Sequence, residues 1–274
     1  MSLVDISFAA LLIGSQLVYI GVVLTLGMRL LLLAKRSRQL PEALLAAHFL
    51  LCCGLGYVVL ITGLSGARDP TLMSASVVTA LISIGYLASA IGVFAEAGFN
   101  FLVFRRDDGW AKGLMVLFGA TLATGYTGYW LTGGFHTGVF AGVWLWMLYG
   151  SFIAVAAWVM IEPLVYHRTM QKRLQLGLAE PMVVNRFLLW GVGSVLRFVM
   201  VVGGIIPSVI FDGQKAQLRP DAVGWTLLAV ALVGVGVAVS YSLTFFPTKG
   251  YVQFIEDRTA RVPKARPIDH GDSR

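Results

Sequence analysis

The chain has 274 residues, of which 57% are hydrophobic and 13% charged, and its mean hydropathy is +0.79. A soluble domain typically carries about 25% charged residues, so the composition excludes an ordinary soluble domain. The net charge of +7 does not indicate nucleic-acid binding, because the basic residues gather at the ends of apolar segments. The composition therefore predicts an all-α protein embedded in a lipid bilayer.

Seven apolar runs fill the chain, and a helix needs roughly 20 such residues to cross the hydrocarbon core. Of the 21 Lys and Arg residues, 17 lie on the side that holds the first, third and fifth connections and the C-terminus, which the positive-inside rule assigns to the cytoplasm. Arg68, Lys215 and Arg219 lie in the opposite connections, and Arg197 lies inside a run. We therefore expect a polytopic seven-transmembrane-helix bundle in a bacterial-type inner membrane, with the N-terminus outside and the C-terminus inside.

Turn signals and prolines divide the runs into seven expected helices. In chain order these are Ile6–Leu33, Pro41–Leu64, Leu72–Phe104, Trp110–Trp130, Val139–Tyr166, Pro181–Phe211 and Val223–Phe246. The first helix lacks the basic start of a signal peptide and ends in Lys35-Arg36-Ser37-Arg38, so we expect it to be retained. The inner connection His167–Glu180 has the composition to continue the fifth helix into the cytoplasm for several turns.

The helices are expected to form one transmembrane domain, residues 1–250, followed by a short amphipathic segment and a disordered cytoplasmic tail in residues 251–274. Two segments, His48–Leu51 and Arg186–Leu189, share a local pattern, and each helix is followed by an outer turn of Arg, Pro and Asp. A 3+1+3 parallel repeat would explain this likeness. Chance similarity between apolar sequences is the alternative.

Arg197 lies on the order of 20 Å along the sixth helix, close to mid-membrane. An Arg at the centre of a bilayer costs at least about 2.5–3.5 kcal/mol, so this side chain must face a partner, the bundle interior or water. Glu96 in the third helix, about 13 Å from the inner boundary, is the expected partner. Such a pair is either a static lock between two helices, or a switch or coupling-ion site.

Two more ionisable groups lie within the apolar runs. His48 lies about 10 Å into the second helix, and a lone His at that depth is more often a hydrogen-bonded packing residue than a ligand. Glu162 lies near the inner end of the fifth helix beside Pro163, which removes a backbone hydrogen bond. An interfacial carboxylate and a mobile inner gate are both possible interpretations. With Arg197 and Glu96, these residues are the candidates for a buried polar switch or a ligand or ion site.

Several polar and aromatic side chains within the runs are candidates to line a cavity, although packing is the commoner role of such aromatic residues. They are Asn100, Tyr57, Tyr86, Trp144, Tyr149, Ser194 and Tyr241.

The sequence predicts no cofactor. The seventh helix has no Lys for a retinal Schiff base, and no second His follows His48 at the spacing of a haem or metal ligand set. Cys52 and Cys53 are neighbours that would point in different directions on an α-helix, so we expect neither a disulfide nor a metal site. No HExxH, GxSxG or phosphate-binding glycine loop occurs, and no enzymatic activity is expected.

The leading hypothesis is a receptor-like or sensory membrane protein that binds a small apolar or amphipathic ligand within the bundle. A rearrangement of the third and sixth helices would reach a cytoplasmic or membrane protein partner at the basic inner face. A facilitator or proton-coupled small-molecule carrier is the alternative, and a structural subunit of a membrane complex is the third possibility.

Overall fold

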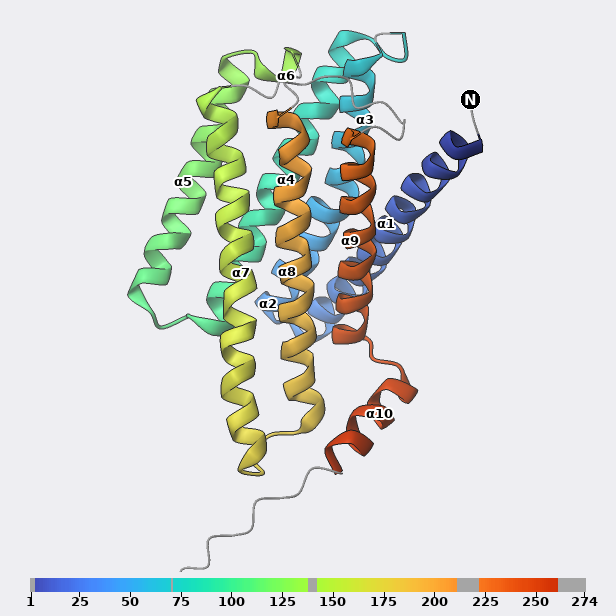
Figure 1. The fold of residues 1–274 in the computed structure, drawn as a ribbon. Coiled ribbons are helices and arrows are strands. Elements are labelled where there is room, and N and C mark those ends of the chain that lie inside the picture. Colours follow the sequence, from blue (N-terminus) through green and yellow to red (C-terminus); the bar gives the residue numbers. More distant parts are fainter. Residues whose placement is uncertain (1–2, 70, 138–141, 211–221, 261–274) are drawn as a thin grey trace, which may run out of the picture.

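A computed structural model describes residues 3–69, 71–137, 142–210 and 222–260. These residues are almost entirely helical, and no strand occurs among them, which confirms the prediction of an all-α protein (Figure 1). Lys215 and Arg219, which were expected in an outer connection, and the predicted tail, residues 261–274, lie outside the described residues.

Among the described residues, six helical segments are long and apolar enough to cross a membrane, which indicates a multi-pass membrane protein by length and composition. They belong to α1 (Leu3–Ser37), the continuous helix Leu40–Arg68, α4 (Ala75–Phe104), α7 (Val143–Gln175), α8 (Pro181–Ile210) and α9 (Ala222–Phe245). Large apolar side chains point outward from these helices: Leu17 and Val143 are each 64% exposed. Such a surface suits lipid rather than water.

The expected fourth span, Trp110–Trp130, forms helix α5 (Gly109–Leu131), but α5 is not among the six. Its 23 residues include five Gly and three Thr, which lower its hydropathy. Hydropathy therefore supports six spans and does not establish a seventh. In Figure 1, α5 nevertheless runs alongside α7 in the opposite direction, and it packs against both α4 and α7.

The connections agree with the sequence in part. Helix α7 continues to Gln175, as predicted, and the amphipathic segment forms α10 (Lys249–Ala260). The expected outer loop after α5 instead contains a short helix, α6 (Gly134–Thr137). Val139, the expected start of the fifth helix, lies outside the described residues, and α7 begins at Val143.

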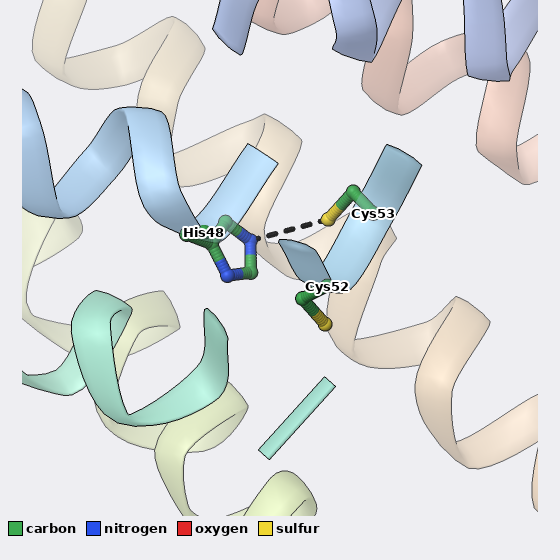
Figure 2. Close-up of side chains that lie close together, drawn as sticks. All are labelled: His48, Cys52 and Cys53. Atoms are coloured by element: carbon green, nitrogen blue, oxygen red, sulfur yellow. Dashed lines mark hydrogen bonds between the residues drawn. The ribbon is translucent and has the colours of Figure 1, made fainter. Parts of the chain in front are cut away.

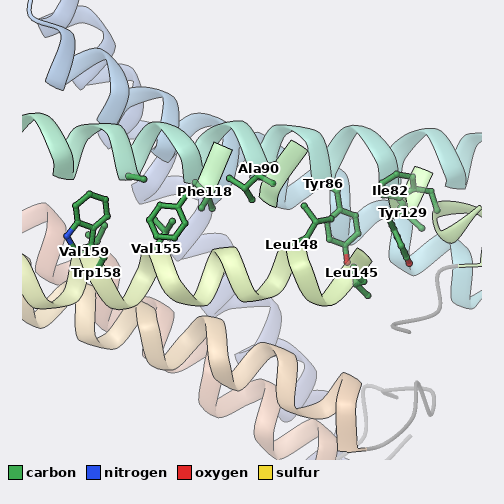
Figure 3. Packing of buried hydrophobic residues seen from close by; sticks show 14 of the residues in the cluster. Ile82, Tyr86, Ala90, Phe118, Tyr129, Leu145, Leu148, Val155, Trp158 and Val159 are labelled. Atoms are coloured by element: carbon green, nitrogen blue, oxygen red, sulfur yellow. The ribbon is translucent and has the colours of Figure 1, made fainter. Parts of the chain in front are cut away.

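Helix α4 is central because it contributes to two hydrophobic cores. The first core joins α4 with α5 and α7 (Figure 3), through Ile82, Tyr86, Ala90, Phe118, Leu148, Val155 and Val159 among others. The second core joins α4 with α1, the second span and α9, through Phe99, Tyr19, Leu26, Phe49 and Tyr241 among others. Because α4 takes part in both cores, it lies between the two groups of helices that form them.

The second span is not the regular α-helix expected from the sequence. It passes from α2 (Leu40–Ala47) into a π-helix, η1 (His48–Gly54), and then into α3 (Leu55–Arg68). Two glycines permit this segment. A Cβ at Gly56 would collide with the backbone oxygen of Leu51, and a Cβ at Gly54 would lie 3.0 Å from the backbone oxygen of Phe49. Short π-helical segments occur frequently at functional sites.

Candidate functional site

Arg197 on α8 and Glu96 on α4 form a buried ion pair, so the structure brings the two expected partners together. The Nη2 atom of Arg197 is 2.6 Å from Oε2 of Glu96. The two residues are 3% and 2% exposed. Each charge alone would be costly to bury, and the opposite charge offsets much of that cost.

His48 on η1 is the third member of this group. Its Nδ1 lies 3.1 Å from the Gly92 carbonyl oxygen, which can only accept, so Nδ1 carries the hydrogen. Its Nε2 lies 3.2 Å from Nη1 of Arg197, which can only donate, so Nε2 accepts. These two contacts fit a neutral imidazole with its hydrogen on Nδ1. We call Arg197, Glu96 and His48 the polar cluster; it connects η1, α4 and α8.

Two cysteines adjoin the polar cluster, although no site was expected at them from the sequence. The Sγ atom of Cys53 lies 3.2 Å from Nε2 of His48 (Figure 2). In an α-helix residue i+4 lies over residue i, whereas in a π-helix residue i+5 does, and Cys53 is residue i+5 from His48. One ligand atom each from His48, Cys52 and Cys53 lie within 4.8 Å of one another. The expected divergence of the two cysteines assumed α-helical geometry, which this segment does not have.

Gly92 allows η1 to approach α4 closely enough to build the cluster. A Cβ at Gly92 would lie 2.7 Å from both the backbone nitrogen and the Cβ of Cys52. Small residues permit such contacts between membrane helices. The available signal was the spacing of Gly92 four residues before Glu96, which places both on one face of α4.

Asn100 lies one further turn along the same face of α4 as Glu96 and is fully buried, at 0% exposure. Neither Oδ1 nor Nδ2 of Asn100 has a hydrogen-bond partner among the described residues, and the same holds for Nε of Arg197. Buried polar groups are nearly always hydrogen-bonded. These three atoms therefore give the site unused donor and acceptor capacity.

Two other predicted cavity residues, Ser194 and Tyr241, border the polar cluster. Their hydroxyl oxygens are 3.3 Å apart, and Ser194 precedes Arg197 by three residues on α8. The Tyr241 ring packs edge to face on Phe49, the neighbour of His48, with ring centroids 5.4 Å apart.

Glu162 belongs to a different contact. Both of its carboxylate oxygens accept from Nε of Arg105, at 2.9 and 3.0 Å, and Oε1 also accepts from Nε1 of Trp158 at 3.0 Å. The hydrogen bonds to Glu162 raise the pKa of Arg105. Because Arg105 follows Glu96 by nine residues, this contact lies about 13 Å farther along α4.

The remaining cavity candidates lie in contacts between other helix pairs. Tyr86 on α4 and Tyr149 on α7 bring their hydroxyls to 2.8 Å, and Tyr57 on α3 donates to Oε1 of Gln16 on α1 at 2.9 Å. Trp144 on α7 covers Gly128 on α5, where a Cβ would collide with the indole. These four side chains join neighbouring helices away from the α4–α8 contact.

Comparison with protein-family models, curated proteins and solved structures gives no match. The function is accordingly inferred from the residues of the site.

Proposed function

We propose that this chain is a receptor-like or sensory integral membrane protein in which the polar cluster is a switch between helices. The observation that carries the proposal is the buried Arg197–Glu96 pair together with the unpaired polar atoms of Asn100 and Arg197. A lock that served packing alone would gain stability by satisfying those atoms. Their unused capacity supports a site that exchanges partners, and the proposal includes no catalytic step.

The ligand class follows from the surroundings of the cluster. A small amphipathic molecule would place its apolar body among side chains such as Phe49 and Tyr241, and its polar group against Asn100 and Nε of Arg197. A ligand shifts a conformational equilibrium only through its different affinity for the two states. Withdrawal of Arg197 from Glu96 by the ligand would favour the second state and move α8 relative to α4.

The signal would leave the bundle at the connection between α7 and α8. The last turn of α7 carries Lys172 and Arg173, which provide a basic surface for a cytoplasmic or membrane protein partner. Movement of α8 would alter this connection directly, since it joins the two helices.

The proposed topology has seven spans, with α5 as the fourth, the N-terminus outside and the C-terminus inside a bacterial-type inner membrane. In Figure 1 the start of α1 and helix α10 lie towards opposite ends of the bundle, which favours an odd number of crossings. A 3+1+3 repeat would make α5 the linker. Its two matching motifs differ locally, because His48–Leu51 is π-helical and Arg186–Leu189 is α-helical.

Breaking the polar cluster tests the switch. We expect Arg197→Ala and Glu96→Gln each to populate a second conformation, because each leaves a buried partner without its counter-charge. Spin labels attached to p-acetylphenylalanine at the positions of Arg106 and Glu180 allow the distance between them to be measured by pulsed electron paramagnetic resonance. A second distance would reveal the second conformation. The expected result is a second distance population in each single variant and in the double variant.

Tyr57→Phe is the control, since it removes one hydrogen bond between a different pair of helices. Tyr57→Phe should show the same distance distribution as the parent protein. If the same single distance occurs in Arg197→Ala, Glu96→Gln and the double variant, the polar cluster is a static lock and the proposed function is wrong.

A proton-coupled carrier is the second candidate, and one observation favours it. The Glu96 carboxylate lies 3.6 Å from Nδ1 of His48, so a carboxylate and an imidazole, both able to hold a proton, lie side by side in the bundle. Net uptake into proteoliposomes that depends on a pH gradient would identify a carrier, because a receptor produces no flux.

A further inference from the structure

We infer that His48, Cys52 and Cys53 form a binding site for a soft monovalent metal ion, Cu(I). One imidazole and two thiols lie on a single seven-residue segment, with their ligand atoms within 4.8 Å of one another. Figure 2 shows the sulfur of Cys53 directed at the imidazole, 3.2 Å from Nε2. Thiolate and imidazole ligands of this kind select Cu(I) or Zn²⁺ over harder ions.

The donor spacing fits one ion. With metal–sulfur and metal–nitrogen bonds of about 2.3 and 2.0 Å, three donors spaced evenly around one ion lie about 3.5–4.0 Å apart. Donors within 4.8 Å of one another therefore need to move by less than about 1 Å. The π-helix supplies this spacing, because it places Cys53 over His48 while Cys52 remains next to both.

The hydrogen bonding of His48 is that of a metal ligand. A ligating histidine almost always donates its other ring N–H to a carbonyl or a carboxylate, which fixes the tautomer. His48 donates from Nδ1 to the Gly92 carbonyl at 3.1 Å, and this leaves the lone pair on Nε2, the atom nearest to Cys53.

The number of ligands favours Cu(I) over Zn²⁺. A structural zinc ion takes four ligands, whereas this segment offers three. Nη1 of Arg197 lies 3.2 Å from Nε2 of His48, so a ligand that approaches this nitrogen lies beside the guanidinium. Two thiolates with Cu(I) would carry one net negative charge.

Binding would proceed without a redox step. Each thiol loses its proton, the two protons leave for water, and Cu(I) takes up two thiolates and the lone pair of Nε2. That lone pair now accepts from Arg197, so the metal replaces this hydrogen bond and frees the guanidinium from His48. Cu(I) would therefore be a ligand that acts on the proposed switch, and this part of the inference rests on the proposed function. Metal binding itself does not depend on that function.

Cu(I) binding to the full-length protein in detergent tests the site. The chain contains only two cysteines, so Cys52→Ser/Cys53→Ser removes every thiol. Under anaerobic reducing conditions, with bicinchoninate as the competing chelator, we expect the parent protein to bind one Cu(I) per chain. Affinity should fall at least 100-fold in the double variant, and X-ray absorption of the parent should show sulfur and nitrogen ligands.

Tyr57→Phe is again the control and should bind as the parent does. Should the double variant fail to fold, Cys52→Ser carries the test, because Cys52 is only half-buried. Equal Cu(I) affinity in the parent and the cysteine variant, or tighter binding of Zn²⁺ than of Cu(I), would overturn the inference.

The label distance between positions 106 and 180 separates the metal site from the proposed function. If Cu(I) binds through the cysteines but neither Cu(I) nor the polar-cluster variants change the distance, the metal site stands and the switch falls. If the variants change the distance but no Cu(I) binds, the switch stands and the metal site falls.

Discussion

Two carboxylates, Glu96 and Glu162, are buried in the same bundle but are satisfied in different ways. Both oxygens of Glu162 accept from Arg105, and one also accepts from Trp158. Glu96 is held by a single ion pair with Arg197, beside an imidazole 3.6 Å away. We therefore interpret Glu162 as a fixed tie between Arg105, at the end of α4, and α7, and Glu96 as the residue able to change partner.

Removing the fixed tie should destabilise the protein. Glu162→Ala leaves the Trp158 N–H and the Arg105 guanidinium without their acceptor, and we expect the free energy of unfolding to fall by about 1–3 kcal/mol. Denaturant titration in mixed micelles measures this change. Asp108→Ala is the matched control, because its 3.3 Å contact with Arg105 is partly exposed and should be worth less than about 1 kcal/mol. Equal losses in the two variants would show that Glu162 is not a tie.

The sequence predicted the ionisable members of the polar cluster, Arg197, Glu96 and His48, and missed the cysteine beside them. Arg197 and Glu96 could be found because a charge in an apolar run is costly and needs a partner. Cys53 could not be found, because its position depends on the π-helical register of residues 48–54, which no local pattern encodes. The spacing of Gly92 from Glu96 was visible in the sequence, but its close contact with η1 was not.

The helices themselves followed closely from apolar runs and breakers. Pro181 begins α8 as predicted, and the observed ends of α4 and α9 lie within three residues of the expected ones. The π-helix was missed because its cause is partly tertiary. Gly54 faces Leu24 of α1 and Gly92 of α4 faces Cys52, so two neighbouring helices accommodate the altered segment.

The contact at Gly92 leads to a prediction for η1. Ala is a better helix former than Gly by about 1 kcal/mol, so Gly→Ala in open space should be neutral or stabilising. Gly21→Ala on α1 is such a case, since nothing lies within 4 Å of the added Cβ. Gly92→Ala should instead lower the melting temperature, because its Cβ would lie 2.7 Å from the Cys52 backbone. A melting temperature for Gly92→Ala at or above that for Gly21→Ala would contradict the close approach of η1 to α4.

For the whole molecule, the number of spans depends on α5. Its hydropathy places it outside the six clear spans, whereas its packing against α4 and α7 favours a seventh. The sequence predicted the membrane class because composition alone determines it. It could not establish the count, because a helix rich in Gly and Thr crosses a bilayer only if neighbouring helices cover its polar groups.

Cysteine labelling in intact cells decides the count. On a Cys52→Ser/Cys53→Ser background, Thr132→Cys, directly after α5, and Lys172→Cys, in the last turn of α7, place single thiols at exposed positions. If α5 spans the membrane and the N-terminus is outside, an impermeant maleimide should label position 132 and not position 172. The reverse pattern would show six spans, and Ser74→Cys, in the outer connection before α4, is the positive control for both.

The ion pair also has an electrical consequence. Glu96 and Arg197 carry opposite unit charges 2.6 Å apart, and the two hydrogen bonds of His48 keep its ring neutral, so the polar cluster has no net charge. Moving one unit charge across a membrane potential of about 100 mV is worth about 2.3 kcal/mol. A joint displacement of the pair along the membrane normal therefore does no electrical work, whereas its separation along that direction does. The membrane voltage therefore acts on the polar cluster only when the pair comes apart.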